Sequence, residues 1–85
     1  MRIRVKLYAS LSSLLPKGIK PHDGFELEVP DGYTPNQLID QLEVPRPMAH
    51  LVLRNGTYIK AEDRDSPKVL EDGDVFAVWP PIAGG

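Results

Sequence analysis

The chain has 85 residues, of which 41% are hydrophobic, and this length allows one domain with one modest core. The charged fraction is 26% and the formal net charge is -2, so the chain lacks the basic excess with which proteins neutralise nucleic-acid phosphates. It contains no cysteine, which excludes a disulfide framework, a thiolate nucleophile and a cysteine-based zinc site.

The first strand is predicted over residues 2–8, where Ile3, Val5 and Leu7 alternate with polar or amphipathic side chains. This alternation argues against a secretory signal peptide, because the apolar core of such a peptide is an uninterrupted stretch. No apolar run approaches the roughly 20 residues that span a bilayer, so we expect no membrane contact. A chain without cysteine suits a reducing compartment, and we expect a cytoplasmic protein.

A loop and a second strand are predicted next. Residues 10–24 hold two prolines and two glycines, which indicates a loop with one helical turn near residues 11–15. Residues 25–29 alternate again and predict a strand that pairs with the first as a wide hairpin.

The main helix is predicted to begin at Thr34. This threonine suits the N-cap, Pro35 suits the first helical position, and Gln37 stands three residues after the cap, where its side chain can bond back. An apolar stripe continues for about two turns until Pro45 and Pro47 forbid further helix.

Three further strands complete the predicted sheet. Asn55-Gly56 suits a two-residue turn with both residues at positive φ, and it predicts a hairpin of residues 50–54 and 57–60. Residues 75–79 form a near-continuous apolar run, typical of a strand flanked on both sides, so we place this strand centrally. The order ββαβββ predicts an α+β fold with a mixed sheet and one main helix packed on one face.

The familiar catalytic and ligand-binding patterns are absent from the sequence. His22 and His50 have no third ligand at metal-binding spacing, and the acidic residues of 61–66 do not complete a calcium loop. The serines of residues 10–13 lack an activating neighbour, and the glycines match no phosphate-binding loop. We therefore expect no bound metal or cofactor, and turn hydrogen bonds explain the serines better than catalysis does.

The carboxyl terminus is the remaining place for chemistry. Gly84 and Gly85 remove every Cβ from the last two positions, which lets a terminal carboxylate enter the active site of another protein. Pro80 and Pro81 follow the predicted central strand, cannot donate to a sheet, and favour an extended chain that points outward. Gly84-Gly85 alone also fits a frayed end or a truncated one.

Residues 70–85 closely resemble the C-terminal signature of the molybdopterin-synthase small subunit, within the MoaD/ThiS family of ubiquitin-like sulfur carriers. The similarity extends over the whole chain and implies a β-grasp domain of residues 1–81 with a flexible tail of residues 82–85. It implies that an ATP-dependent activating enzyme of the MoeB/ThiF type adenylates Gly85, which then becomes a thiocarboxylate. It further implies that the tail enters a MoaE-like large synthase subunit and that the carrier itself is no enzyme.

The resemblance also implies a partner-binding surface. Its aromatic members are Tyr8, Tyr58 and Trp79, and a β-grasp sheet with parallel first and last strands brings Tyr8 and Trp79 together. Tyr8 and Trp79 stand where phenylalanine is familiar in the family, and Tyr58 equally fits plain cross-strand packing. The remaining implied contacts belong to the tail and its root, namely Pro80, Pro81, Ile82 and Ala83.

Several functions remain open at this stage. The paired prolines favour molybdopterin synthesis, but carriers for thiamine, tRNA thiolation, cysteine and tungsten cofactor pathways share the same features. A ubiquitin-like modifier joined to lysines through Gly85 begins with the same acyl-adenylate, and an interaction module would need no acyl chemistry. We expect a monomer in the free state and a hetero-oligomer with the synthase.

Overall fold

The structure is a computed structural model and describes residues 1–81. Its strands are β1 (Arg2–Leu7), β2 (Phe25–Glu28), β3 (Leu51–Arg54), β4 (Thr57–Tyr58) and β5 (Val75–Trp79). Its helices are the α-helix α1 (Pro35–Gln41) and the 3-10 helices η1 (Ala9–Leu14), η2 (Arg46–Met48) and η3 (Ala61–Asp63). The predicted order ββαβββ is confirmed, with the fourth strand shorter than expected.

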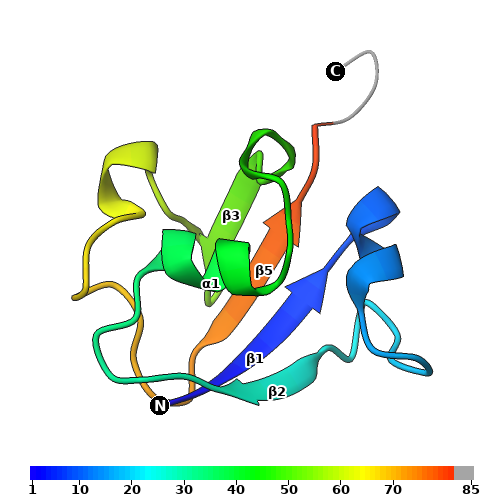
Figure 1. Ribbon diagram of the computed structural model, residues 1–85, viewed down its shortest axis with the longest axis horizontal. Helices are drawn as coiled ribbons and strands as arrows, with labels where there is room; N and C mark the ends of the chain where they lie inside the picture. Colours follow the sequence, from blue (N-terminus) through cyan, green and yellow to red (C-terminus); the bar gives the residue numbers. More distant parts are fainter. Residues whose placement is uncertain (82–85) are drawn as a thin grey trace.

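The strands form one mixed sheet in the order β2-β1-β5-β3-β4 (Figure 1). β2 runs antiparallel to β1, which confirms the predicted wide hairpin, and β3 runs antiparallel to both β4 and β5. The first and last strands, β1 and β5, are parallel neighbours. β5 therefore occupies the centre of the sheet, as its apolar run predicted.

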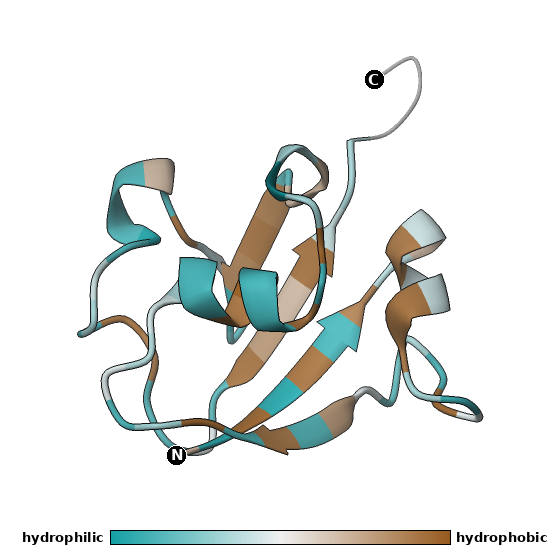
Figure 2. Ribbon diagram, in the orientation of Figure 1, coloured by the Kyte–Doolittle hydropathy of each residue, from teal (hydrophilic) through white to brown (hydrophobic). Residues whose placement is uncertain are grey.

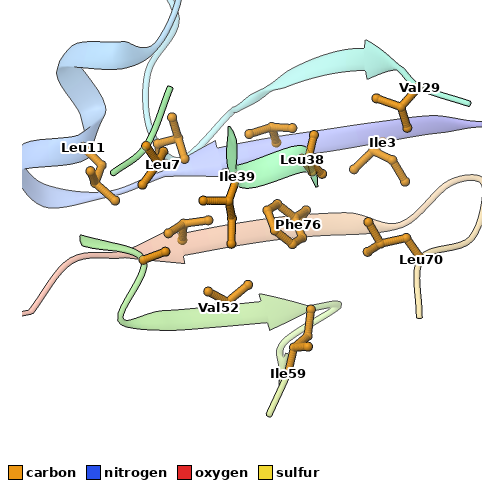
Figure 3. Packing of buried hydrophobic residues seen from close by; sticks show 14 of the residues in the cluster. Ile3, Leu7, Leu11, Val29, Leu38, Ile39, Val52, Ile59, Leu70 and Phe76 are labelled. Carbon is orange, nitrogen blue, oxygen red and sulfur yellow. The ribbon is translucent and has the colours of Figure 1, made fainter. Parts of the chain in front are cut away.

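The core lies between the sheet and α1. Ile3, Val5 and Leu7 alternate onto the inner face and are fully buried, while the intervening residues of β1 face outward. Figure 2 shows this alternation as brown and teal bands along β1. Leu38 and Ile39 of α1 are also fully buried, and Figure 3 places them among the side chains around Phe76 of β5.

The helix begins as predicted, but a different structural motif ends it. The Thr34 hydroxyl accepts from the Gln37 amide at 3.0 Å, and the Gln37 side chain accepts from the Thr34 amide at 2.9 Å, a complete capping box. The helix ends at Gln41, before the prolines that we expected to stop it. Glu43 has a φ of 62°, and the Val44 amide donates to the Ile39 carbonyl at 3.1 Å, which is a Schellman motif.

Two loop predictions are refined by the structure. Asn55 and Gly56 both have positive φ, at 49° and 84°, which confirms the predicted tight turn. The expected turn near residues 11–15 is a 3-10 helix that starts earlier, at Ala9, directly after β1. No helix within residues 1–81 has the length and apolar character that crossing a membrane requires.

Candidate functional site: the root of the tail and the outer face of the sheet

The end of β5 lies at the same edge of the sheet as the end of β1, because the two strands are parallel. The amide of Tyr8 donates to the carbonyl of Val78 at 3.1 Å, and the amide of His50 donates to the carbonyl of Trp79 at 3.1 Å. The two neighbouring chain segments therefore hold β5 up to its last two residues, Val78 and Trp79.

β5 ends where the two prolines begin, as predicted. Neither Pro80 nor Pro81 has an N–H group to extend the hydrogen-bond ladder. Pro80 is buried and Pro81 is exposed, so the chain passes from the sheet to the surface within two residues. The remaining predicted tail residues lie outside the described part of the chain, namely Ile82, Ala83, Gly84 and Gly85.

Two aromatic rings stack beside this exit. The ring centroids of Tyr8 and Trp79 are 4.3 Å apart and the ring planes differ by 7°. Both side chains are half-buried on the outer face of the sheet, opposite the face that α1 covers. The expected meeting of Tyr8 and Trp79 is therefore confirmed, and stacking fixes the orientation of both rings.

The outer face continues as an apolar surface towards β4. Leu51 pairs with Trp79, and Leu53 pairs with both Ala77 and Tyr58, so these side chains share the outer face. Figure 2 shows β3 as hydrophobic over most of its length, without the alternation seen in β1. We call the following set the outer apolar face: Tyr8, Leu51, Leu53, Tyr58, Ala77 and Trp79.

Tyr58 lies at the far edge of this face. Tyr58 is 51% exposed and pairs with Leu53 across the hairpin. The residue therefore takes part in cross-strand pairing and also offers an exposed surface. The guanidinium of Arg64 lies 5.7 Å from the centre of the Tyr58 ring, and donates to the carbonyl of Ala49 at 2.9 Å. Arg64 thus fixes Tyr58 from the loop side and ties that loop to the start of β3.

A buried carboxylate holds the other end of β5. Asp74 is 5% exposed and accepts from Arg54 Nε at 2.6 Å, from Asn55 Nδ2 at 3.0 Å and from the Glu71 amide at 2.8 Å. The Asn55 side-chain oxygen accepts in turn from the Val75 amide at 2.8 Å. These bonds join the β3–β4 turn to the start of β5.

The environment of Asp74 changes its titration. Burial alone would raise the pKa of the Asp74 carboxyl, but hydrogen bonds from Arg54, the Glu71 amide and Asn55 outweigh burial and hold that pKa below its usual value. The carboxylate therefore stays ionised at neutral pH, with charged and neutral donors around it.

The other residues considered from the sequence lie apart from this site. His22 and His50 are exposed, and no cluster of three or more potential metal ligands occurs within residues 1–81. Ser12 and Ser13 donate from their hydroxyls to the carbonyls of Ala9 and Ser10, at 2.7 and 3.1 Å. These turn hydrogen bonds confirm the structural interpretation of the serines.

The sequence interpretation missed part of the outer apolar face. Leu51 and Leu53 carried a usable signal, because alternation across the predicted hairpin places them on the same face as Tyr58. Arg64 carried no such signal, since it lies in an acidic segment with no apolar pattern. Its contacts with Tyr58 and Ala49 depend on how that loop folds back onto the hairpin.

The sheet order, the single covering α-helix and the parallel pairing of first and last strands define a ubiquitin-like β-grasp domain. Residues 5–85 match the family model described as the ThiS family. The chain belongs to this family, the ThiS/MoaD group of ubiquitin-like proteins, whose members are small carrier proteins. Among curated proteins, none matches the sequence.

Solved structures with the same fold include two named as molybdopterin converting factor subunits. The putative subunit 1 from Pyrococcus furiosus is 25% identical, with a TM-score of 0.64 over 95% of this chain and 98% of that one. A complex of subunits 1 and 2 from Helicobacter pylori 26695 contains a chain that is 20% identical, with a TM-score of 0.57 and full coverage of both chains. SAMP1 from Haloferax volcanii is 20% identical, with a TM-score of 0.66 and full coverage of both.

Proposed function

We propose that this protein is a sulfur carrier whose reactive group is the terminal carboxylate of Gly85. The supporting observation is the root of the tail: β5 is held on one side up to Val78 and on the other up to Trp79, and two prolines then lead the chain away beside an apolar face. A rigid domain that presents the beginning of a slender tail suits delivery of an acyl group into a partner. The domain itself is a carrier and leaves catalysis to its partners.

The proposed chemistry needs an activating partner. The Gly85 carboxylate attacks the α-phosphorus of ATP on an adenylating enzyme, pyrophosphate leaves, and an acyl-adenylate forms. A sulfide-equivalent donor then attacks the acyl carbon, the bond to AMP breaks, and a thiocarboxylate remains. ATP is thus a substrate of the partner, and the proposal assigns no bound cofactor to this chain.

We infer further that the sulfur acceptor is the molybdopterin precursor, held by a large synthase subunit. This inference draws on the tail motif Pro80 to Gly85 and on the two similar structures named as molybdopterin converting factor subunits. Because the similar Helicobacter pylori chain was solved in a complex of subunits 1 and 2, we expect this chain to form a hetero-oligomer with a second subunit. We expect the free chain to be a monomer.

A second function has support of similar weight. SAMP1 from Haloferax volcanii, whose name denotes a small archaeal modifier protein, shares the fold over its full length. A modifier would pass its Gly85 acyl group to a lysine of a target protein rather than to sulfur. Both functions begin with the same adenylate, so adenylation alone does not separate them.

Intact-mass measurement of the protein purified from its own cells separates the two. A carrier yields a fraction that is heavier by the exchange of one oxygen for one sulfur at Gly85. A modifier yields Gly-Gly branches on lysines of other proteins instead. A variant that lacks Gly85 is the matched control, because it keeps residues 1–81 intact and loses both products under either proposal.

Gene deletion then identifies the acceptor. Loss of molybdoenzyme activity supports molybdopterin synthesis, while a requirement for thiamine or cysteine, unthiolated tRNA or loss of tungsten enzymes indicates a sister pathway. A native mass that shows residues beyond Gly85, with no trimming, contradicts every acyl function considered.

A further inference from the structure

A row of ion pairs joins β1 to β2 on the outer face of the sheet. Arg4 pairs in register with Glu26, and their side chains form an ion pair at 2.9 Å. Arg2 stands opposite Glu28 and approaches Glu28 at 3.8 Å and Glu26 at 3.6 Å. Two outward cations of β1 are therefore matched by two glutamates of β2.

The row stops at the third outward cation, Lys6. The register places Val5 opposite Phe25, so the position beside Lys6 belongs to Gly24, which has no side chain. Within residues 1–81, no carboxylate lies within 4.0 Å of the Lys6 ammonium. Lys6 thus differs from Arg2 and Arg4 in forming no ion pair with the described residues.

The backbone itself maintains this gap. Gly24 is buried, with a φ of 66°, and a Cβ added there would lie 2.4 Å from the carbonyl oxygen of Val5 and 2.8 Å from Cγ of Lys6. No other residue fits at Gly24 without a shift of the β1–β2 pair. A third glutamate at this place is therefore sterically excluded, and the stem of Lys6 occupies the space instead.

Lys6 also borders the outer apolar face. Its partner in β5 is Ala77, a small side chain that is 8% exposed, so little stands beside Lys6 on that strand. The next outward residue along the chain is Tyr8, directly after β1, which stacks on Trp79 at the root of the tail. Lys6 therefore stands at the edge of an apolar surface, close in the sheet to the place where β5 ends.

We propose that Lys6 is a charge anchor for the adenylating enzyme, which presents an aspartate or glutamate to it while covering the outer apolar face. A carboxylate docked there completes the row that Arg4–Glu26 and Arg2–Glu28 begin. The proposal rests on the proposed function, and it names this partner because sulfur carrier and modifier both require adenylation. Opposite charges at the rim of an apolar contact align two proteins and speed their encounter.

A second copy of this chain is a poorer occupant of the same face. The outward carboxylates of β2 belong to Glu26 and Glu28, and both already lie beside arginines. Two copies placed face to face would each bring an unmatched Lys6. We therefore assign the carboxylate that pairs with Lys6 to a different protein.

The test is direct binding of the full chain to the adenylating enzyme from the same organism, measured by calorimetry at low and high salt. We expect Lys6→Glu to weaken binding about tenfold or more, and Lys6→Met to weaken it less while removing much of the salt dependence. Lys68→Glu is the matched control, because Lys68 is exposed on the segment between η3 and β5 and the net charge changes equally. We expect it to bind within about twofold of the parent chain.

Adenylation of Gly85 by the same enzyme is measured in parallel. Lys6→Glu should raise KM and leave kcat unchanged, because the proposed anchor acts in binding the enzyme and takes no part in acyl transfer at Gly85. Equal losses for Lys6→Glu and Lys68→Glu overturn the proposal, as does a Lys6-dependent dimer of this chain. Lys6-dependent binding without adenylation overturns the proposed function alone, and absence of binding by the parent chain overturns both.

Discussion

The side chain of Asn55 spans the β3–β4 turn and the start of β5: its Nδ2 donates to Asp74 at 3.0 Å, and its Oδ1 accepts from the Val75 amide at 2.8 Å. Asn55 also has a φ of 49°, which the tight turn requires and which asparagine tolerates. One residue therefore shapes the turn and connects it to the central strand.

Loss of the Asp74 charge should destabilise the protein. We expect Asp74→Asn to lower the free energy of unfolding by about 2 kcal/mol at neutral pH. The new side-chain amide is uncharged, so its oxygen binds Arg54 more weakly, and its NH2 group replaces one of the two oxygens that accept from Arg54 and Asn55. Chemical denaturation measures the change. A loss below about 0.5 kcal/mol would contradict the role given to this carboxylate.

Asp74 should also make the free energy of unfolding depend on pH in the acidic range. The pKa of Asp74 is lower in the folded chain than the usual value near 3.9, so its contribution is present above that value and is lost as pH falls towards the lowered pKa. We expect the parent chain to lose more stability than Asp74→Asn between about pH 5 and pH 2. Parallel unfolding curves for the two chains would contradict this assignment.

Gly24 should tolerate no side chain. Gly24→Ala places a Cβ against the Val5 carbonyl at 2.4 Å and keeps a positive φ, and we expect a loss of about 3 kcal/mol. Gly18→Ala is the control, because Gly18 also has a positive φ but meets nothing within 4 Å, and about 1 kcal/mol is expected there. Thermal unfolding compares them, and equal losses would show that the close approach at Gly24 has no effect.

Glu43 is a site where a substitution should stabilise the chain. Glu43 lies just after the end of α1 and has a φ of 62°, a conformation that glycine adopts without strain. We expect Glu43→Gly to raise the free energy of unfolding by about 0.5–1 kcal/mol, and Glu43→Ala to bring no such gain. If Glu43→Gly destabilises the chain, the Glu43 side chain stabilises the fold by more than its backbone strain costs.

The Tyr8–Trp79 stack should be visible by fluorescence, since Trp79 is the single tryptophan. Tyr8→Ala exposes one face of the indole, so we expect a red-shifted emission and a loss of about 1–2 kcal/mol in stability. Tyr8→Phe keeps the ring and should leave both quantities close to the parent values. Unchanged emission in Tyr8→Ala would contradict the stacked arrangement.

The parts of the fold that depend on neighbouring residues were predictable from the sequence. The capping box of Thr34 and Gln37, the Asn55-Gly56 turn and the alternation of β1 each follow from a few adjacent positions. The contact of Tyr8 with Trp79 was not predictable from adjacent positions alone, because the parallel pairing of the first and last strands came from the family resemblance.

The missed features depend on contacts between distant segments. Glu43 adopts its left-handed conformation to close a Schellman motif, although its side chain gives no hint of that role. The bonds of Arg64 with Ala49, and of Asp74 with Arg54, form only after the loops fold back onto the hairpin. Lys6 shows the same limit, because the lack of an ion-pair partner for it among residues 1–81 follows from the register of β1 with β2.

The central place of β5 has a consequence for synthesis on the ribosome. The sheet consists of two pairs, β2-β1 and β3-β4, and within the described chain only β5 joins them. Among residues 1–81, β5 is the last strand in chain order, so the two pairs cannot join into one sheet until β5 has been translated and has left the exit tunnel. A polypeptide interrupted before β5 would lack the strand that joins the two pairs, and could not complete this sheet.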